Sequence, residues 1–211
     1  MEKKILYICI IIISAYCIYQ KISFNSQVRA NSENQQINYP LLALKDGVEI
    51  EDSCKGRMID DIKITTTEGK EDYLYNTLSE YSDGYYLLVI SSIKACSNCR
   101  EQILKIWNEV YREKKDTPIL FIVTEDRDIK KSSIRQIKAS IKGLDIDIPF
   151  YLDHESNLLG FFGVTPYQTP LSVILDHNKK VIAVDKASEL TGERTIAFKN
   201  FFLSLNASEV K

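Results

Sequence analysis

Histidine and cysteine are both scarce in this chain, and their scarcity argues against two common kinds of small protein. The 211 residues contain 2 histidines and 5 cysteines. A zinc site built on a Cys-x-x-Cys pair needs two further Cys or His ligands, and His154 and His177 lack the spacing of paired ligands. A disulfide framework would need more exported cysteines, in an even number. We therefore expect no metal and no cofactor.

An excess of basic residues is also missing. Lys and Arg total 27 against 29 Asp and Glu, and the formal net charge is -2. Basic residues cluster only in short pairs such as Lys114-Lys115, which are typical of solvated surfaces. The charge gives no reason to expect a nucleic-acid partner. A hydrophobic content of 45% with 27% charged residues indicates an ordinary globular domain.

Long apolar runs are confined to the amino terminus. Residues 5–19 are strongly apolar and follow Lys3 and Lys4, so residues 1–21 are predicted to be a membrane anchor or signal segment. We favour an uncleaved anchor, because no small-x-small cleavage site follows closely. A cleaved signal, a lipid anchor at Cys17 and a buried helix stay open as alternatives.

The amino-terminal lysines would stay in the cytoplasm, so the rest of the chain would be exported. This places the protein in the bacterial inner membrane, with its domain facing the periplasm or the cell exterior. Residues 22–39 are rich in Asn, Gln and Ser, as expected of a tether. Residues 40–211 then form the globular domain.

Cys96 and Cys99 form a Cys-Ser-Asn-Cys pair shortly after the continuous apolar run at residues 85–90. The run predicts a central strand buried on both faces, and the apolar spacing in residues 97–111 predicts a helix. Two thiols at a helix start can close a disulfide, and the helix N-terminus stabilises a thiolate on the first. We expect Cys96 to attack partner disulfides, with Lys94 favouring its thiolate, and the more buried Cys99 to resolve the mixed disulfide. A purely structural disulfide is the alternative.

The remaining periodicity predicts an α/β fold, with a central mixed sheet flanked by helices and an N-terminal β extension. Further strands are expected at residues 48–50, 62–65, 119–123, 148–152, 171–175 and 181–184. Further helices are expected at residues 129–141, 157–162 and 191–205.

From about residue 61 to residue 206 the chain resembles the TlpA-like disulfide reductases, in the redoxin branch of the thioredoxin superfamily. The resemblance rests on Thr67-Glu68-Gly69-Lys70, Leu87-Leu88-Val89-Ile90, Cys96-Ser97-Asn98-Cys99-Arg100-Glu101, Gly163-Val164 and Thr169-Pro170-Leu171-Ser172-Val173-Ile174-Leu175-Asp176. It implies a thioredoxin-like fold for residues 40–211. It also implies a cis Pro170 beside the thiols, with the Thr169 backbone available to an extended substrate peptide. A trans proline at a strand edge, or a cis Pro166, is the alternative.

The chain departs from the family pattern around the thiols. Ala95 stands where the family usually carries Trp, and Ile90 occupies the position six residues before Cys96, so no acid lies there. Gln102 replaces a frequent Glu, so Glu101, a bound water or the substrate would accept the proton of Cys99.

Three functions follow. The first is a membrane-anchored, exported thiol-disulfide oxidoreductase that reduces disulfide-containing exported proteins and is itself reduced by a membrane or soluble thiol donor; an oxidase direction stays open. A thiol peroxidase is less favoured, because Ile93 stands where peroxiredoxin-like redoxins carry Thr. The third is a binding or scaffold module without turnover.

Cys54 lies among charged residues and is expected near the surface, as a bystander, a third redox thiol or a docking point.

Overall fold

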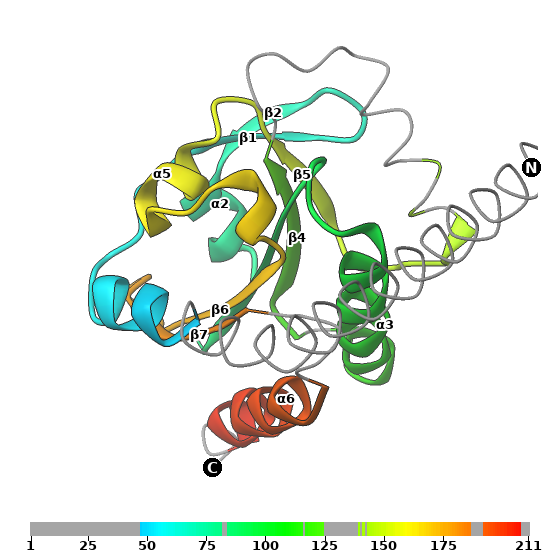
Figure 1. Ribbon diagram of the computed structural model, residues 1–211. Coiled ribbons are helices and arrows are strands. Elements are labelled where there is room, and N and C mark those ends of the chain that lie inside the picture. The colour runs from blue at the N-terminus through cyan, green and yellow to red at the C-terminus, as the bar shows by residue number, and fades with distance from the viewer. Residues whose placement is uncertain are drawn as a thin grey trace, which may run out of the picture. The chain divides into compact units, whose positions relative to one another are not determined.

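The computed structural model describes residues 47–81, 84–115, 117–124, 139, 141, 143–186 and 192–207. Ala43–Lys211 form one compact unit around a central sheet (Figure 1). The predicted anchor at residues 1–21, the tether at residues 22–39 and most of the predicted helix at residues 129–141 lie outside the described residues. Within the described ranges, no helix combines the length and the apolar character that a membrane crossing requires.

The sheet has seven strands in the order β2-β1-β5-β4-β3-β6-β7. The strands are β1 Lys63–Thr66, β2 Glu71–Tyr73, β3 Tyr86–Ser92, β4 Ile119–Thr124, β5 Phe150–Asp153, β6 Leu171–Leu175 and β7 Val181–Lys186. β3 pairs in parallel with β4, and β4 with β5, whereas the other neighbouring pairs are antiparallel. The predicted mixed sheet is confirmed. β3 is buried along its whole length, as its continuous apolar run predicts.

Helices cover both faces of this sheet (Figure 1). They are α2 Leu74–Ser79, α3 Ser97–Glu113, α5 Asn157–Phe162, the 3-10 turn η1 Pro166–Gln168 and α6 Gly192–Ala207. One core cluster joins Leu87 and Val89 of β3 to Trp107 of α3 and Phe202 of α6. The opposite cluster joins Leu88 and Ile90 of the same strand to residues of α2 and α5. The period of two along β3 thus divides the core into two layers.

The N-terminal β extension is present; the predicted strand at residues 62–65 is confirmed as β1, but its hairpin partner is β2 rather than residues 48–50. β1 and β2 form an antiparallel hairpin across a turn in which Gly69 has a φ of +90°. The predicted strand at residues 48–50 is wrong, because residues 47–54 are helical. Three residues with helical spacing, Gly47, Ile50 and Cys54, are buried together on one side of this segment, whereas Val48 is 50% exposed.

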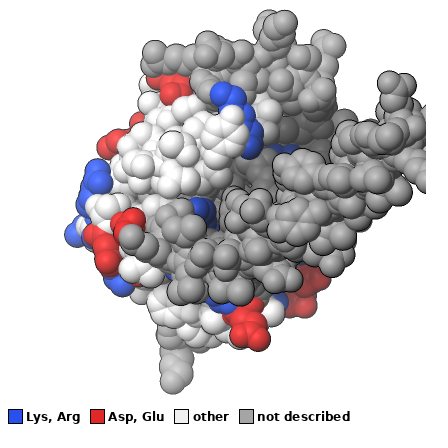
Figure 2. Space-filling model, viewed as in Figure 1, with Lys and Arg blue, Asp and Glu red and all other residues white. Residues whose placement is uncertain are grey.

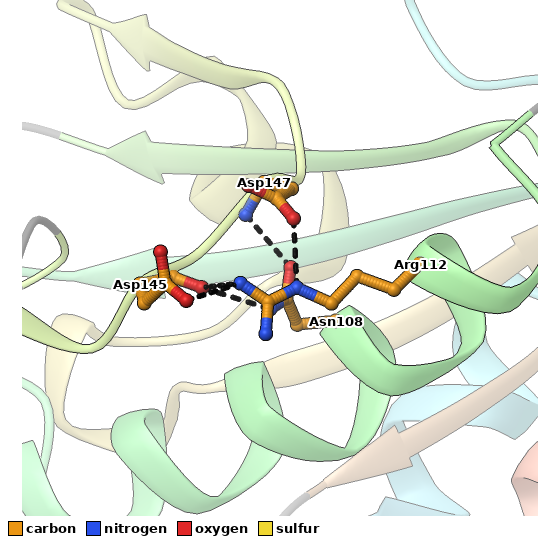
Figure 3. A network of polar contacts seen from close by, with 4 residues as sticks. All are labelled: Asn108, Arg112, Asp145 and Asp147. Carbon is orange, nitrogen blue, oxygen red and sulfur yellow. Dashed lines mark hydrogen bonds and ion pairs between the residues drawn. The ribbon is translucent and has the colours of Figure 1, made fainter.

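A polar network fixes α3 to the segment before β5 (Figure 3). Asn108 donates to the Asp145 carbonyl at 3.1 Å and accepts from the Asp147 backbone N–H at 2.8 Å. Arg112 Nη2 lies 2.6 Å from Asp145 Oδ2, and Arg112 Nε lies 2.7 Å from Asp147 Oδ2. The helix that begins at the cysteine pair is therefore held at its far end as well as by its apolar face.

Candidate active site: a dithiol at a helix N-terminus

Cys96 and Cys99 lie at the start of α3, one helical turn apart. Cys96 is the N-cap residue, and its Sγ accepts a hydrogen bond from the Cys99 backbone N–H at 3.3 Å. Both cysteines are in the reduced, thiol form; Cys96 is exposed, whereas Cys99 is buried. An exposed sulfur at a helix N-terminus faces unsatisfied backbone N–H groups and the positive end of the helix dipole. The predicted difference in exposure between the two cysteines is confirmed.

The loop at Pro170 lies against the end of β3, directly upstream of the cysteine pair. The Thr169-Pro170 peptide bond is cis, as the sequence comparison implied, and Pro166 instead begins η1. Thr169 is buried, and its Oγ1 accepts from the Ser92 backbone N–H at 2.9 Å and donates to the Pro166 carbonyl at 2.8 Å. Ile90 of β3 pairs with Leu171 of β6 at the end of the strand ladder. The hydrogen bond between the Ser92 N–H and the Thr169 hydroxyl connects the two chain segments just beyond this last strand pair.

Ser92 connects every part of this site, and sequence reasoning did not single it out. Its hydroxyl accepts from the Lys94 backbone N–H at 3.1 Å, and its carbonyl accepts from the Ala95 backbone N–H at 3.1 Å. The same carbonyl accepts from Arg100 Nη1 at 3.2 Å, while the Ser92 N–H reaches Thr169. The available signal was a pair of serines at the end of an otherwise apolar buried strand.

Arg100 is the second residue whose role was missed. The sequence presented it only as part of the Cys-Ser-Asn-Cys-Arg-Glu motif, yet its side chain is buried, with 7% exposure. Burial lowers the pKa of Arg100, while the nearby Glu101 and Cys96 raise it. A guanidinium keeps its charge at neutral pH even after such a shift. A fixed positive charge therefore lies inside the site.

The two supporting residues proposed from sequence lie at the edge of the site. Lys94 is exposed on the loop before Cys96, and Glu101 is half-buried on the first turn of α3. Ala95 and Ile90 are buried, so these positions are filled by apolar side chains rather than by Trp and an acid. Within the part of the chain that the structure describes, no three His, Cys, Asp or Glu side chains gather in a manner suited to a metal ion.

The expectation that Cys54 lies near the surface is wrong. Its exposure is 0%, and its Sγ donates to the Ile50 carbonyl at 3.0 Å within the helical segment of residues 47–54. Burial, the largest cause, raises the pKa of the Cys54 thiol to about 11. A thiol with no exposed surface cannot serve as a docking point, so the bystander interpretation is the one that fits.

No family model and no curated protein sequence matches this chain. Its structure matches the exposed lipoprotein thioredoxin of Streptococcus pneumoniae with a TM-score of 0.52 and 22% identity, covering 69% of this chain and 100% of that chain. A Chlorobium tepidum protein assigned as thiol:disulfide interchange protein DsbE matches with a TM-score of 0.55 and 14% identity, covering 72% of this chain and 96% of that chain. The thioredoxin domain of a Bacteroides vulgatus thiol-disulfide oxidoreductase matches with a TM-score of 0.51 and 13% identity, covering 71% of this chain and 98% of that chain. The chain has a thioredoxin-like fold. At these identities the likeness establishes the fold, and the chemistry must be argued from the site.

Proposed function

We propose that this protein is a membrane-anchored, exported thiol-disulfide oxidoreductase of the TlpA-like kind, which reduces disulfides in partner proteins. The observation that carries the proposal is the asymmetric dithiol at the start of α3, with Cys96 exposed and Cys99 buried one turn later. An exposed sulfur can meet a disulfide on another protein, and a neighbouring thiol can then release that protein within the same molecule. The thioredoxin-like fold of the solved neighbours supports the same chemistry.

In the proposed reaction the Cys96 thiolate attacks one sulfur of the partner disulfide. A Cys96–partner disulfide forms, the partner's own S–S bond breaks, and its second sulfur leaves as a thiolate that takes a proton from water. Cys99 then attacks Cys96 and gives its proton to Glu101, to water or to the departing sulfur. The products are a reduced partner and a Cys96–Cys99 disulfide, so two electrons have passed to the partner. A membrane or soluble dithiol donor restores the starting pair.

The surface beside the dithiol fits a neutral, extended segment of a partner protein. Residues 156–175 contain no charged residue, and Figure 2 shows an area without charged side chains over part of the α5 and η1 region. Arg57 borders α5, with its guanidinium 4.7 Å from the centre of the Phe161 ring. Tyr167 on η1 is 73% exposed, and Pro170 has no backbone N–H, which leaves the Thr169 backbone for pairing. We propose disulfide-containing exported proteins as partners, and residues 1–21 as the anchor in a bacterial inner membrane.

The proposal is tested by the reduction of insulin disulfides with dithiothreitol as the electron donor and the full-length chain as catalyst. We expect C96S to abolish catalysis. C99S, pre-reduced and mixed with insulin after the dithiothreitol has been removed, should retain the first attack and accumulate a Cys96–insulin mixed disulfide, because the resolving thiol is gone. The matched control is C54S, which alters a thiol outside the dithiol and should keep catalysis.

Two other outcomes would replace the proposal. Cys96-dependent consumption of hydrogen peroxide without insulin reduction indicates a thiol peroxidase. Absence of both activities, together with retained binding of a partner by C96S, indicates a thioredoxin-like binding module.

A further inference from the structure

The buried guanidinium of Arg100 is the least expected group in this part of the fold. Arginine is almost never fully buried unless its charge has partners, because removing it from water is costly. Here Nη1 donates to the Ser92 carbonyl at 3.2 Å, and the side chain keeps only 7% exposure. The Ser92 carbonyl also accepts from Ala95, so the guanidinium is fixed on the loop that leads into Cys96.

Arg100 lies within electrostatic reach of the Cys96 sulfur. Its backbone N–H donates to the Cys96 carbonyl at 3.0 Å, which places both residues in the first turn of α3. Cys96 and Arg100 are four residues apart at the start of the helix, a spacing that places them on one face. Burial lowers the pKa of Arg100, and the charges of Glu101 and Cys96 oppose this shift. Coulomb attraction is mutual, and a fixed cation therefore favours negative charge on the sulfur.

We infer that Arg100 is a positioning residue whose buried charge stabilises the Cys96 thiolate and thereby biases the pair towards its reduced, dithiol form. The inference rests on the proposed redox function of the pair. In the Cys96–Cys99 disulfide neither sulfur carries a charge, so the attraction to the guanidinium exists only in the reduced state. A pair whose dithiol form is stabilised accepts electrons more readily and is a weaker reductant.

The other groups that face Cys96 do not duplicate this effect. Lys94 is exposed, so water and salt screen its charge, and Glu101 carries the opposite charge on the same turn of α3. Ser92 at the end of β3 and Thr169 beside Pro170, which contact each other next to the loop that leads into Cys96, are uncharged. The buried guanidinium is screened much less than these surface groups.

The test is a redox titration of the full-length chain in glutathione buffers, read by mass spectrometry after alkylation. Trypsin cuts after Lys94 and Arg100, so residues 95–100 carry both thiols on one peptide; in R100Q the peptide extends to Lys105. We expect R100Q to lower the equilibrium constant for reduction of the pair about tenfold, equivalent to about 30 mV. R100K, which keeps the charge, should stay within about threefold of the wild type.

A second readout separates charge from simple structural support. Brief pulses of iodoacetamide at a series of pH values should show slower labelling of Cys96 in R100Q at pH 7, with the rates converging at high pH. The matched control K105Q removes a positive charge from the exposed face of the same helix and should leave both readouts unchanged. R100M keeps the length and the apolar stem of the side chain, and replaces R100Q if that variant does not fold.

The inference is overturned if the neutral variant keeps an equilibrium constant within twofold of the wild type, or if R100K shifts it as far as R100Q does. Failure of the underlying function looks different. In that case the wild-type chain itself forms no reversible Cys96–Cys99 disulfide in any buffer, and the inference falls with it.

Discussion

Replacing Thr169 by Val tests whether the hydroxyl contact between the Pro170 loop and β3 holds the site together. Val has nearly the same shape, but it can neither accept from the Ser92 N–H nor donate to the Pro166 carbonyl, contacts that measure 2.9 Å and 2.8 Å. Ser92 has 0% exposure, so its N–H would be left without water. An unsatisfied buried donor costs about 1–3 kcal/mol, and the second hydrogen bond adds about 1 kcal/mol. The free energy of unfolding should therefore fall by about 2–4 kcal/mol.

Urea unfolding followed by tryptophan fluorescence measures this loss. Trp107 is the single tryptophan of the chain, and it is fully buried on α3, where its Nε1 donates to Ser172 Oγ at 3.0 Å. T169S keeps the hydroxyl and removes only a methyl group. Its loss in the free energy of unfolding should therefore be less than half of the loss that T169V shows. In the absence of denaturant, T169V should also reduce insulin more slowly than T169S. In T169V the Pro170 loop is no longer hydrogen-bonded to the end of β3.

A loss below about 0.5 kcal/mol for T169V would refute this reasoning, since that is less than a single net hydrogen bond contributes. Equal losses for T169V and T169S would refute it as well. In that case the packing of the methyl group, and not the hydroxyl, would connect the loop to the strand.

Three further predictions concern groups outside the dithiol. Cys54, with a pKa of about 11, carries a thiolate in about one molecule in a thousand at pH 8. In the native full-length chain, iodoacetamide should therefore label Cys54 slowly at this pH, and rapid labelling would contradict its burial. Burial raises the pKa of Asp153, so the folded state holds this proton more tightly than the unfolded chain. That stabilisation is present below the unfolded value of about 3.9 and is lost as pH rises through the folded value. The free energy of unfolding of the wild type, measured relative to D153N, should therefore fall as the pH rises above 4. A difference in urea midpoints between the two proteins that does not change with pH would exclude this. N108A should lose about 1–2 kcal/mol, because two hydrogen bonds to the segment before β5 disappear (Figure 3). R112A should lose less, because its ion pairs are exposed; the reverse order in thermal melts would contradict the ranking.

Several elements of this fold follow from patterns that are local in the chain. The apolar run before Cys96 predicts a buried central strand, and β3 is buried at every position. The apolar spacing after it predicts the helix, and the structure extends that helix to Glu113. Strand and helix together place Cys96 at a helix start without reference to the rest of the molecule.

Local patterns fail where a short segment fits two periods. Residues 48–50 alternate as a strand would, but three residues are too few to separate alternation from a helical face. The helix buries Cys54 in spite of its charged neighbours, because Glu51, Asp52 and Lys55 point to other sides of the same turn, and none of these three is buried. Neighbours in sequence therefore gave the wrong environment for this thiol.

The sequence by itself determined the identity, spacing and helix-start position of the two thiols, since these depend on residues within one strand–helix unit. Only the tertiary structure decided what surrounds them. The Ser92 carbonyl becomes available to Arg100 at the end of β3, and the Ser92 N–H meets Thr169 in the Pro170 loop, 77 residues away in the chain. A charged side chain is expected in water unless the fold offers it a buried acceptor, and whether an acceptor is there depends on how β3, α3 and the Pro170 loop meet.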